Sequence, residues 1–157
     1  MDLRLAAYAV CIEDGRVLLA RAVRPDGGRT WTLPGGRVEH TEDPFDAVVR
    51  EVGEETGLDT VVERLLGVDS RTVPAAERRV PGSPALQNVG VFYRVRVTGG
   101  RLRPEPNGDT AEPAWTPLSE VPGLVRSSLL DTGLALARTA PATGHVPPVP
   151  VGGLIQH

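Results

Sequence analysis

Two apolar runs near the start of the chain have the length and composition of β-strands. Residues 5–12 and 17–21 are aliphatic and partly β-branched, and a short polar stretch containing Asp14-Gly15 separates them. An Asp-Gly pair favours a hairpin turn because both positions tolerate a positive φ. The pattern therefore predicts two strands that pair with each other. A short segment at residues 31–33 follows, after a loop rich in proline and glycine.

The clearest helix begins after Asp43. Asp43 is a favourable N-cap, and Pro44 suits the first helical position, where its missing N–H is not needed. Gly57 is the residue expected at the C-terminal end. The apolar residues of the segment share one face of this helix and are expected to be buried: Phe45, Val48, Val49 and Val52.

The second half of the chain predicts three further strands and a second helix. The strands are expected at residues 61–68, 87–97 and 114–116, with a proline-rich loop between the first two. A turn is expected at Gly99-Gly100. Ser127 and Ser128 can cap the helix, and its apolar spacing predicts a buried stripe of Leu130, Leu134 and Ala137.

The chain is expected to form one domain followed by a tail. Its 157 residues are 40% hydrophobic, which is enough for one sizeable core. Residues 1–140 are assigned to the domain. Residues 141–157 are rich in proline and glycine and are interpreted as an extended or mobile tail. Alternatively, the apolar end of this tail, residues 151–155, docks on a partner subunit.

Composition excludes some partners. The formal net charge of −3 gives no general attraction to nucleic acid or to a membrane surface. No apolar stretch is long enough to span a membrane, and the run at residues 5–12 lacks a cleavage site, so we expect a cytoplasmic protein without a signal peptide. The single cysteine, Cys11, lies in an apolar run and is interpreted as a buried residue rather than a catalytic thiol.

Three glutamates of the first predicted helix share one face. Glu51, Glu54 and Glu55 fall within an arc of about 100° at helical spacing. Clustered carboxylates repel one another and raise each other's pKa unless a cation neutralises them. Mg²⁺ prefers oxygen ligands and is the expected cation, with Mn²⁺ as a substitute. Arg50 can hold one of the carboxylates in orientation.

A solvated acidic surface is the usual explanation for three glutamates in a helix. The wider spacing argues against it, because Gly36, Glu42, the Arg50-Glu51 pair, the Glu54-Glu55 pair and Gly57-Leu58 stand at fixed intervals. A pattern of this kind arises by chance in roughly 10⁻⁷ to 10⁻⁸ of chains this long.

The stretch WTLPGGRVEHTEDPFDAVVREVGEETGL, residues 31–58, resembles the Nudix box of the Nudix hydrolase superfamily, whose members include MutT-like proteins. The box itself covers residues 36–58, and every specified position matches. The resemblance implies an α/β/α sandwich with a mixed, curved β-sheet between helices. It also implies a role for each matching residue: Glu51, Glu54 and Glu55 as metal ligands, Arg50 orienting Glu51, and Glu42 and Gly57 as structural positions.

Two further ligands follow from the same resemblance. Family members often add a backbone carbonyl from the glycine turn, here at Gly36, and a carboxylate from a distant loop. Glu112 is the candidate for this carboxylate and Asp109 its alternative, although both fit ordinary solvent-facing loop residues equally well. The general base differs among family members, so Glu51 and Glu54 are competing candidates.

Two arginines are assigned to substrate binding. Arg21 ends the second predicted strand and is expected to contact phosphate, with a purely structural role as the alternative, and Arg37 lies in the box loop. His40, in the same loop, is interpreted as a solvated residue. Trp31 and Trp115 are expected to pack in the core or against the site.

The function implied is metal-dependent hydrolysis of a phosphoanhydride bond in a nucleoside diphosphate linked to another moiety. NTPs and dNTPs, nucleotide sugars and ADP-ribose all remain open as substrates, and Pro74 is a weak pointer to ADP-ribose. The alternative is a catalytically silent module that binds or senses a nucleotide. An isomerase acting on prenyl diphosphates shares the fold but needs a well-placed cysteine, for which Cys11 is a poor candidate. The sequence leaves homodimerisation undecided.

Overall fold

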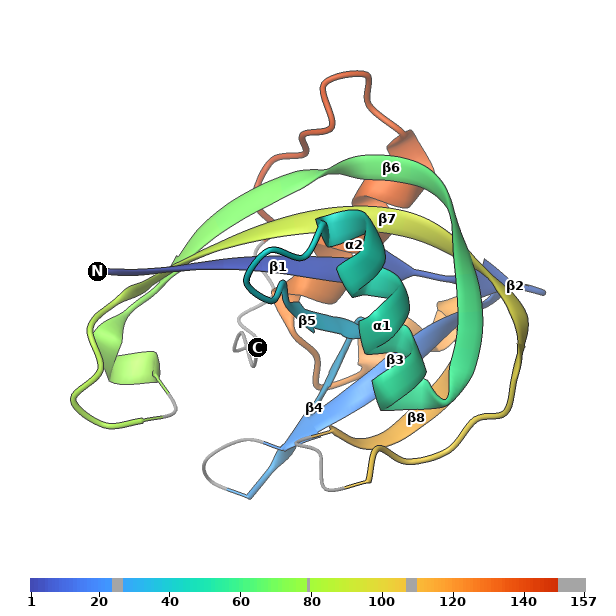
Figure 1. Ribbon diagram of the computed structural model, residues 1–157, viewed down its shortest axis with the longest axis horizontal. Helices are drawn as coiled ribbons and strands as arrows, with labels where there is room; N and C mark the ends of the chain where they lie inside the picture. The colour runs from blue at the N-terminus through green and yellow to red at the C-terminus, as the bar shows by residue number, and fades with distance from the viewer. Residues whose placement is uncertain (24–26, 79, 107–109, 150–157) are drawn as a thin grey trace.

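In the computed structural model, the described residues, 1–23, 27–78, 80–106 and 110–149, form strands with one long helix on each side (Figure 1). Two short 3₁₀-helices lie in the connections. The elements in chain order are β1 (Asp2–Val10), β2 (Ile12–Glu13), β3 (Arg16–Val23), β4 (Arg29–Thr32), β5 (Gly35–Arg37), α1 (Pro44–Thr56), β6 (Leu58–Val73), η1 (Ala75–Glu77), β7 (Leu86–Gly100), β8 (Thr110–Pro117), η2 (Leu118–Gly123) and α2 (Ser128–Thr139).

The strands form two sheets. The first has the order β5-β1-β7-β6, in which β1 and β7 are parallel and the outer pairs are antiparallel. In the second, β3 pairs antiparallel with β2, β4 and β8. The strands β6 and β7 curve strongly around the molecule (Figure 1). The predicted fold class, a mixed and curved sheet between helices, is confirmed.

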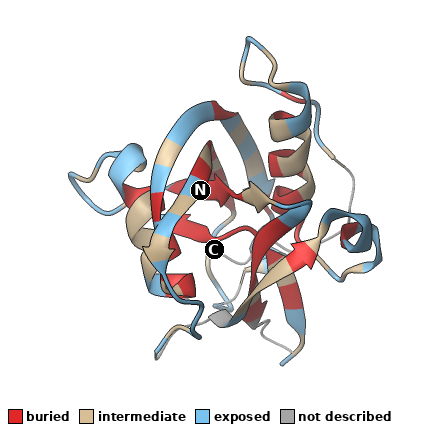
Figure 2. Cartoon of the chain, turned by 90° about the vertical axis from the view of Figure 1, so that its right-hand side faces the viewer, coloured by how far each residue is buried: buried red, intermediate tan, exposed pale blue. Residues whose placement is uncertain are grey.

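From Ala6 to Val10 the strand β1 is buried on both faces. Ala6, Tyr8 and Val10 pack with α2, whereas Ala7 and Ala9 pack with α1. Successive side chains of a strand point to opposite faces, so a strand between two layers needs a continuous apolar run. Figure 2 shows the buried residues concentrated on the strands and on the inward-facing sides of the helices.

The first apolar run is divided between the two sheets, which the sequence analysis did not predict. Its larger part forms β1, and its last residue, Ile12, belongs to β2 and pairs with Val17. The expected hairpin exists only there, where Asp14 and Gly15 adopt φ values of 52° and 72°. Val10 and Cys11 are buried and Ile12 is partly buried, so hydrophobicity alone could not locate the break.

Three strands are longer than predicted. The expected strands at 61–68, 87–97 and 114–116 became β6, β7 and β8, and the first two pair along nearly their whole length. The predicted turn at Gly99-Gly100 was wrong, because these residues pair with Asp59 and Leu58. Register shifts in the β6–β7 pair interrupt the alternation that would have marked the full strands.

Both helices begin where their caps predicted. Asp43 accepts a hydrogen bond from the Phe45 amide at 2.8 Å, and Ser127 accepts one from the Leu129 amide at 3.2 Å. The burial predicted for Phe45 was wrong, since its side chain is 51% exposed and touches the edge of Tyr93.

The predicted stripe on α2 was partly correct. Leu130 is fully buried, but Leu134 and Ala137 are only partly buried. Gly133 lies inside the helix because a Cβ there would be 2.5 Å from Leu33 in the core.

The first residues of the predicted tail lie against β6. The Val68 amide donates to the Gly144 carbonyl at 2.9 Å, and Val146 is buried. The boundary at residue 140 stays a prediction, and the apolar segment 151–155 lies outside the described residues. In the part of the chain that is described, no helix is long and apolar enough to cross a membrane.

Candidate functional site

The loop before α1 brings Glu42 back toward the helix. The Glu39 amide donates to the Glu42 carboxylate at 3.1 Å, and the Glu42 amide donates to the Glu39 carbonyl at 3.0 Å. Thr41 adopts a φ of 70°, which tightens this turn. The Glu42 side chain therefore faces the helix that follows.

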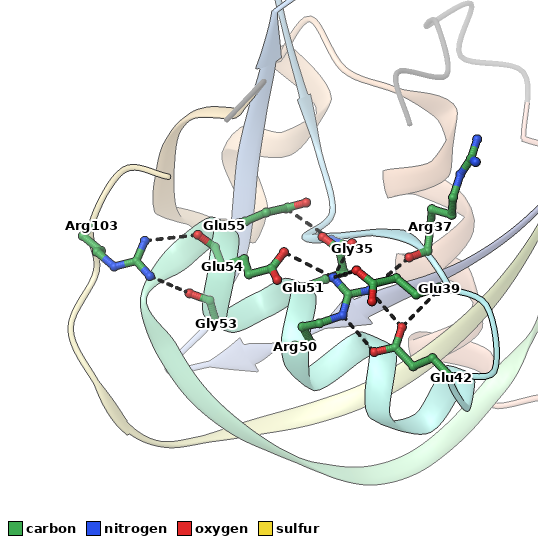
Figure 3. A network of polar contacts seen from close by, with 10 residues as sticks. All are labelled: Gly35, Arg37, Glu39, Glu42, Arg50, Glu51, Gly53, Glu54, Glu55 and Arg103. Carbon is green, nitrogen blue, oxygen red and sulfur yellow. Dashed lines mark hydrogen bonds and ion pairs between the residues drawn. The ribbon is translucent and has the colours of Figure 1, made fainter. Parts of the chain in front are cut away.

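Arg50 is the centre of the polar network in Figure 3. Its Nε and Nη2 donate to the two carboxylate oxygens of Glu42 at 2.8 and 2.9 Å. Its Nη1 donates to Glu51 at 3.1 Å and to Glu54 at 3.2 Å, and its Nη2 also reaches the Arg37 carbonyl. These contacts lower the pKa of Glu42 to about 2 and raise the pKa of Arg50. The geometry thus brings Arg50 and Glu51 into the contact expected from the sequence.

Glu51 and Glu55 form a close pair of carboxylates. Glu55 is 6% exposed and accepts a hydrogen bond from the Gly35 amide at 3.3 Å, toward which its side chain points in Figure 3. Burial raises the pKa of Glu55 well above its usual value, and the neighbouring Glu51 raises it further. Burial also raises the pKa of Glu51, while Arg50 opposes that rise.

The two glycines of β5 allow close approaches, Gly35 to β1 and Gly36 to the Glu51 carboxylate. Gly35 pairs with Tyr8 of β1 at a φ of 152°, and a Cβ on it would lie 2.2 Å from the Ala7 carbonyl oxygen. A Cβ on Gly36 would lie 2.9 Å from the Glu51 carboxylate. Side chains at these positions would displace the backbone or the carboxylate.

The distant residues proposed from the sequence meet each other. Arg21 and Glu112 form an ion pair at 2.8 Å, with the Glu112 side chain 63% exposed. The Arg21 guanidinium lies 5.2 Å from the centre of the Trp31 ring, and its Nε is buried without a hydrogen-bond partner among the described residues. Asp109, the alternative to Glu112, lies outside the described residues.

Comparison with known proteins identifies the family. The model of the NUDIX domain matches residues 2–133, which is most of the chain. The chain belongs to the NUDIX domain family. Enzymes of this family generally use a divalent metal.

Similar proteins include a MutT-like protein and a protein named as a pyrophosphatase. The chain is 50% identical over 115 residues to a MutT-like protein of Streptomyces ambofaciens, a match covering 73% of this chain and 64% of the relative. It is 32% identical over 120 residues to an ADP-ribose pyrophosphatase of Methanocaldococcus jannaschii, covering 76% and 65%. The chain thus spans slightly less than two thirds of the length of either relative.

A solved structure has the same overall fold. The crystal structure of the MutT NUDIX hydrolase from Burkholderia pseudomallei superposes with a TM-score of 0.67 at 29% identity. The match covers 88% of this chain and 99% of the other.

The Nudix carboxylates fit a hard divalent cation in their chemistry. Glu55 is a buried carboxylate whose raised pKa reflects the cost of its charge, and a cation would offset that cost. Gly36 lets the Glu51 carboxylate lie against the backbone of β5, since a Cβ on this glycine would be 2.9 Å from a carboxylate oxygen. Within the described residues, however, no three acidic, histidine or cysteine side chains already converge on one point. Glu54 is instead held by Arg50, so it would have to leave that contact to join the others.

Arg103 supports the Nudix helix and was not predicted from the sequence. Its guanidinium donates to the carbonyls of Gly53 and Glu54, both at 3.1 Å (Figure 3). A cation at the C-terminal end of a helix also interacts favourably with the helix dipole. Arg103 lies almost 50 residues beyond α1, and no local pattern in the sequence marks it.

Three other residues considered in the sequence analysis are Arg37, His40 and Cys11. Arg37 offers its backbone carbonyl to Arg50, while its exposed side chain points away from the carboxylates in Figure 3. His40 is exposed, as predicted. Cys11 is fully buried, and burial raises the pKa of its thiol to about 12, which agrees with a structural rather than a catalytic role.

Proposed function

We propose that the protein is a Mg²⁺-dependent hydrolase that cleaves a phosphoanhydride bond in a nucleoside diphosphate linked to another moiety. The observation that carries the proposal is the Glu51–Glu55 pair beside Gly35 and Gly36, inside a complete Nudix box. A buried pair of carboxylates is costly for a fold, and it is retained where a cation is bound or a proton is transferred. The proposal requires both.

Four groups would hold the cation: the carboxylates of Glu51, Glu54 and Glu55 and the carbonyl of Gly36. Glu112 would join them after release from Arg21. When bound, Mg²⁺ would lower the pKa of a water molecule and offset negative charge on the diphosphate. The role of Glu42 is to hold Arg50, which keeps Glu51 in place after Glu54 turns toward the cation.

The proton of the attacking water would pass to Glu51 or Glu54. A carboxylate accepts a proton better when its pKa is closer to the working pH, and burial raises the pKa of Glu51. Glu54 is the more accessible of the two, with a side chain that is 50% exposed. A comparison of the pH profiles of Glu51→Gln and Glu54→Gln would separate them, because only the base sets the acidic limb of the rate profile.

Arg21 is proposed to contact a phosphate of the substrate. Its Nε has no partner among the described residues, and Trp31 supports the guanidinium from one side. The substrate would replace Glu112 as its anionic partner. Arg21→Ala with unchanged kcat/KM would rule out this role. Arg37 is proposed as a second phosphate contact, supported by its exposure beside the box.

The substrate class is proposed only at the level of a nucleoside diphosphate derivative. The relative named ADP-ribose pyrophosphatase supports ADP-ribose as one candidate. Pro74, the residue that pointed to ADP-ribose, is exposed and precedes η1. A cytoplasmic location suits the unpaired Cys11.

The test is release of phosphate or nucleoside monophosphate from dNTPs, nucleotide sugars and ADP-ribose, with Mg²⁺ or with EDTA. Turnover that needs Mg²⁺ and is lost in Glu54→Gln would support the hydrolase. Glu39→Gln is the matched control, because it removes one charge from the same network at a side chain that is 67% exposed. Tight nucleotide binding without turnover on any substrate would favour the silent sensing module instead.

A further inference from the structure

A cavity lies beside α2, at the edge of the core cluster that packs against this helix and away from the carboxylates of α1. Its volume is about 550 Å³, within the range of pockets that bind small molecules. None of its lining residues belongs to α1 or to β5. They come from β2, β7, η2, α2 and the segments before and after α2: Ile12, Arg94, Leu118, Val121, Pro122, Arg126, Asp131, Leu134, Ala135, Ala137, Arg138 and Val149.

The walls of the cavity are mainly apolar. Leu134 and Ala135 line it from α2, Val121 from η2 and Ile12 from β2. Leu134 and Ile12 are only partly buried although they border the core. A ligand with an apolar body would remove this surface from water.

Two of the charged residues in the wall already form an ion pair with each other. Arg126 and Asp131 form a bidentate ion pair at 2.6 and 3.0 Å. Arg126 also donates to the carbonyls of Pro122 and Leu124, at 3.1 and 3.2 Å. These bonds tie η2 to the first turn of α2, so this wall is fixed before any ligand arrives.

Two other guanidinium groups in the wall have no such partner. Within the described part of the chain, neither Arg94 nor Arg138 makes a hydrogen bond or an ion pair. Asp131 is occupied by Arg126, so the cavity carries uncompensated positive charge although the whole chain has a formal net charge of −3. Arginine binds carboxylate, sulfonate and phosphate groups through paired hydrogen bonds.

We propose that this cavity is a binding site for a small organic anion with an apolar body. The apolar part would lie against Leu134, Ala135 and Ile12, and the anionic group would contact Arg94 and Arg138. The site is separate from the Nudix carboxylates, and the proposal does not depend on hydrolase activity.

Two fluorescent probes with the same ring system test the proposal on the full chain. One, 8-anilinonaphthalene-1-sulfonate, carries an anionic group, and N-phenyl-1-naphthylamine does not. We expect the wild type to bind the anionic probe about tenfold more tightly, the size of one hydrogen bond to a charged group. The variant Arg94→Gln/Arg138→Gln should lose this preference. Arg96→Gln, two residues along β7 and outside the cavity, should keep it.

A second variant locates the bound probe. Ala135→Trp should fill the cavity and abolish binding of both probes, while a thermal unfolding curve checks that the fold is retained. Equal affinity of the wild type for the two probes, or unchanged binding in both cavity variants, would overturn the proposal. Probe binding that is seen only with a variant truncated after Val149, and not with the full chain, would also overturn the proposal. The cavity would then be a docking site for the protein's own C-terminal segment.

Discussion

The ion pair between Glu42 and Arg50 provides the sharpest test of how the Nudix box is held together. Glu42→Gln keeps the shape of the side chain but removes the charge that accepts two hydrogen bonds at 2.8 and 2.9 Å. Arg50 would lose its strongest partner and keep its longer contacts with Glu51, Glu54 and the Arg37 carbonyl. We therefore expect a loss of stability and a less ordered Glu51.

The magnitude follows from the pKa of Glu42. Its displacement from 4.5 to about 2 corresponds to at most about 3 kcal/mol of unfolding free energy. The Glu42 side chain is 16% exposed and that of Arg50 is 23% exposed, so solvent screening reduces the expected loss to about 1–2 kcal/mol.

The loss should depend on pH in one direction. The pKa of Glu42 is lower in the folded protein than in the unfolded chain, so its contribution is present above about pH 4.5 and disappears as the pH falls toward 2. Near pH 3 about two fifths of the neutral-pH effect should remain. The free energy of unfolding of the wild type and of Glu42→Gln can be measured across this pH range by urea unfolding, followed by the fluorescence of Trp31 and Trp115.

Glu39→Gln is the control, because Glu39 lies 3.7 Å from Arg50 and its side chain is 67% exposed. We expect a change of at most about 0.5 kcal/mol for this variant. Equal losses in Glu39→Gln and Glu42→Gln, or a Glu42→Gln loss that is the same near pH 3 as at neutral pH, would refute the reasoning.

Four further predictions concern the carboxylates and the helix that carries them. Gly36→Ala would place a Cβ 2.9 Å from the Glu51 carboxylate and should lower kcat/KM by roughly a hundredfold, as a displaced catalytic group does. Gly123→Ala, where a Cβ meets open space, is its control, and equal activities would contradict the assigned role. Arg103→Gln removes two hydrogen-bond donors from the last turn of α1. The variant should have an unfolding free energy lower by about 1 kcal/mol and a reduced turnover. A urea midpoint and a kcat equal to those of the wild type would contradict this prediction. In EDTA, the raised pKa of Glu55 predicts stability that is present below about pH 4.5 and is lost as the pH rises through the folded-state pKa. Added Mg²⁺ should raise the melting temperature at neutral pH, and no shift at saturating Mg²⁺ would argue against a cation at these carboxylates.

Much of the local structure around the site could be predicted from the sequence. Asp43, Pro44 and Gly57 set the ends of α1, and the helical spacing put Glu51, Glu54 and Glu55 on one face. These features depend on backbone preferences and on neighbours within one or two turns, which the order of residues states directly. The strand ends were less accurate, because β1 and β2 belong to different sheets within one apolar run.

The rest of the site depends on contacts between distant parts of the chain. Arg103 reaches the carbonyls of α1 from about 50 positions away, and Arg21 is paired with Glu112 from 91 positions away. Residue types alone do not specify such pairs, because many arginines and carboxylates are available and the packing of β3 against β8 selects among them. The sequence by itself determined the helix, its caps and its acidic face. Tertiary structure decided which charges neutralise one another, because that depends on distances set by the packing of the whole fold.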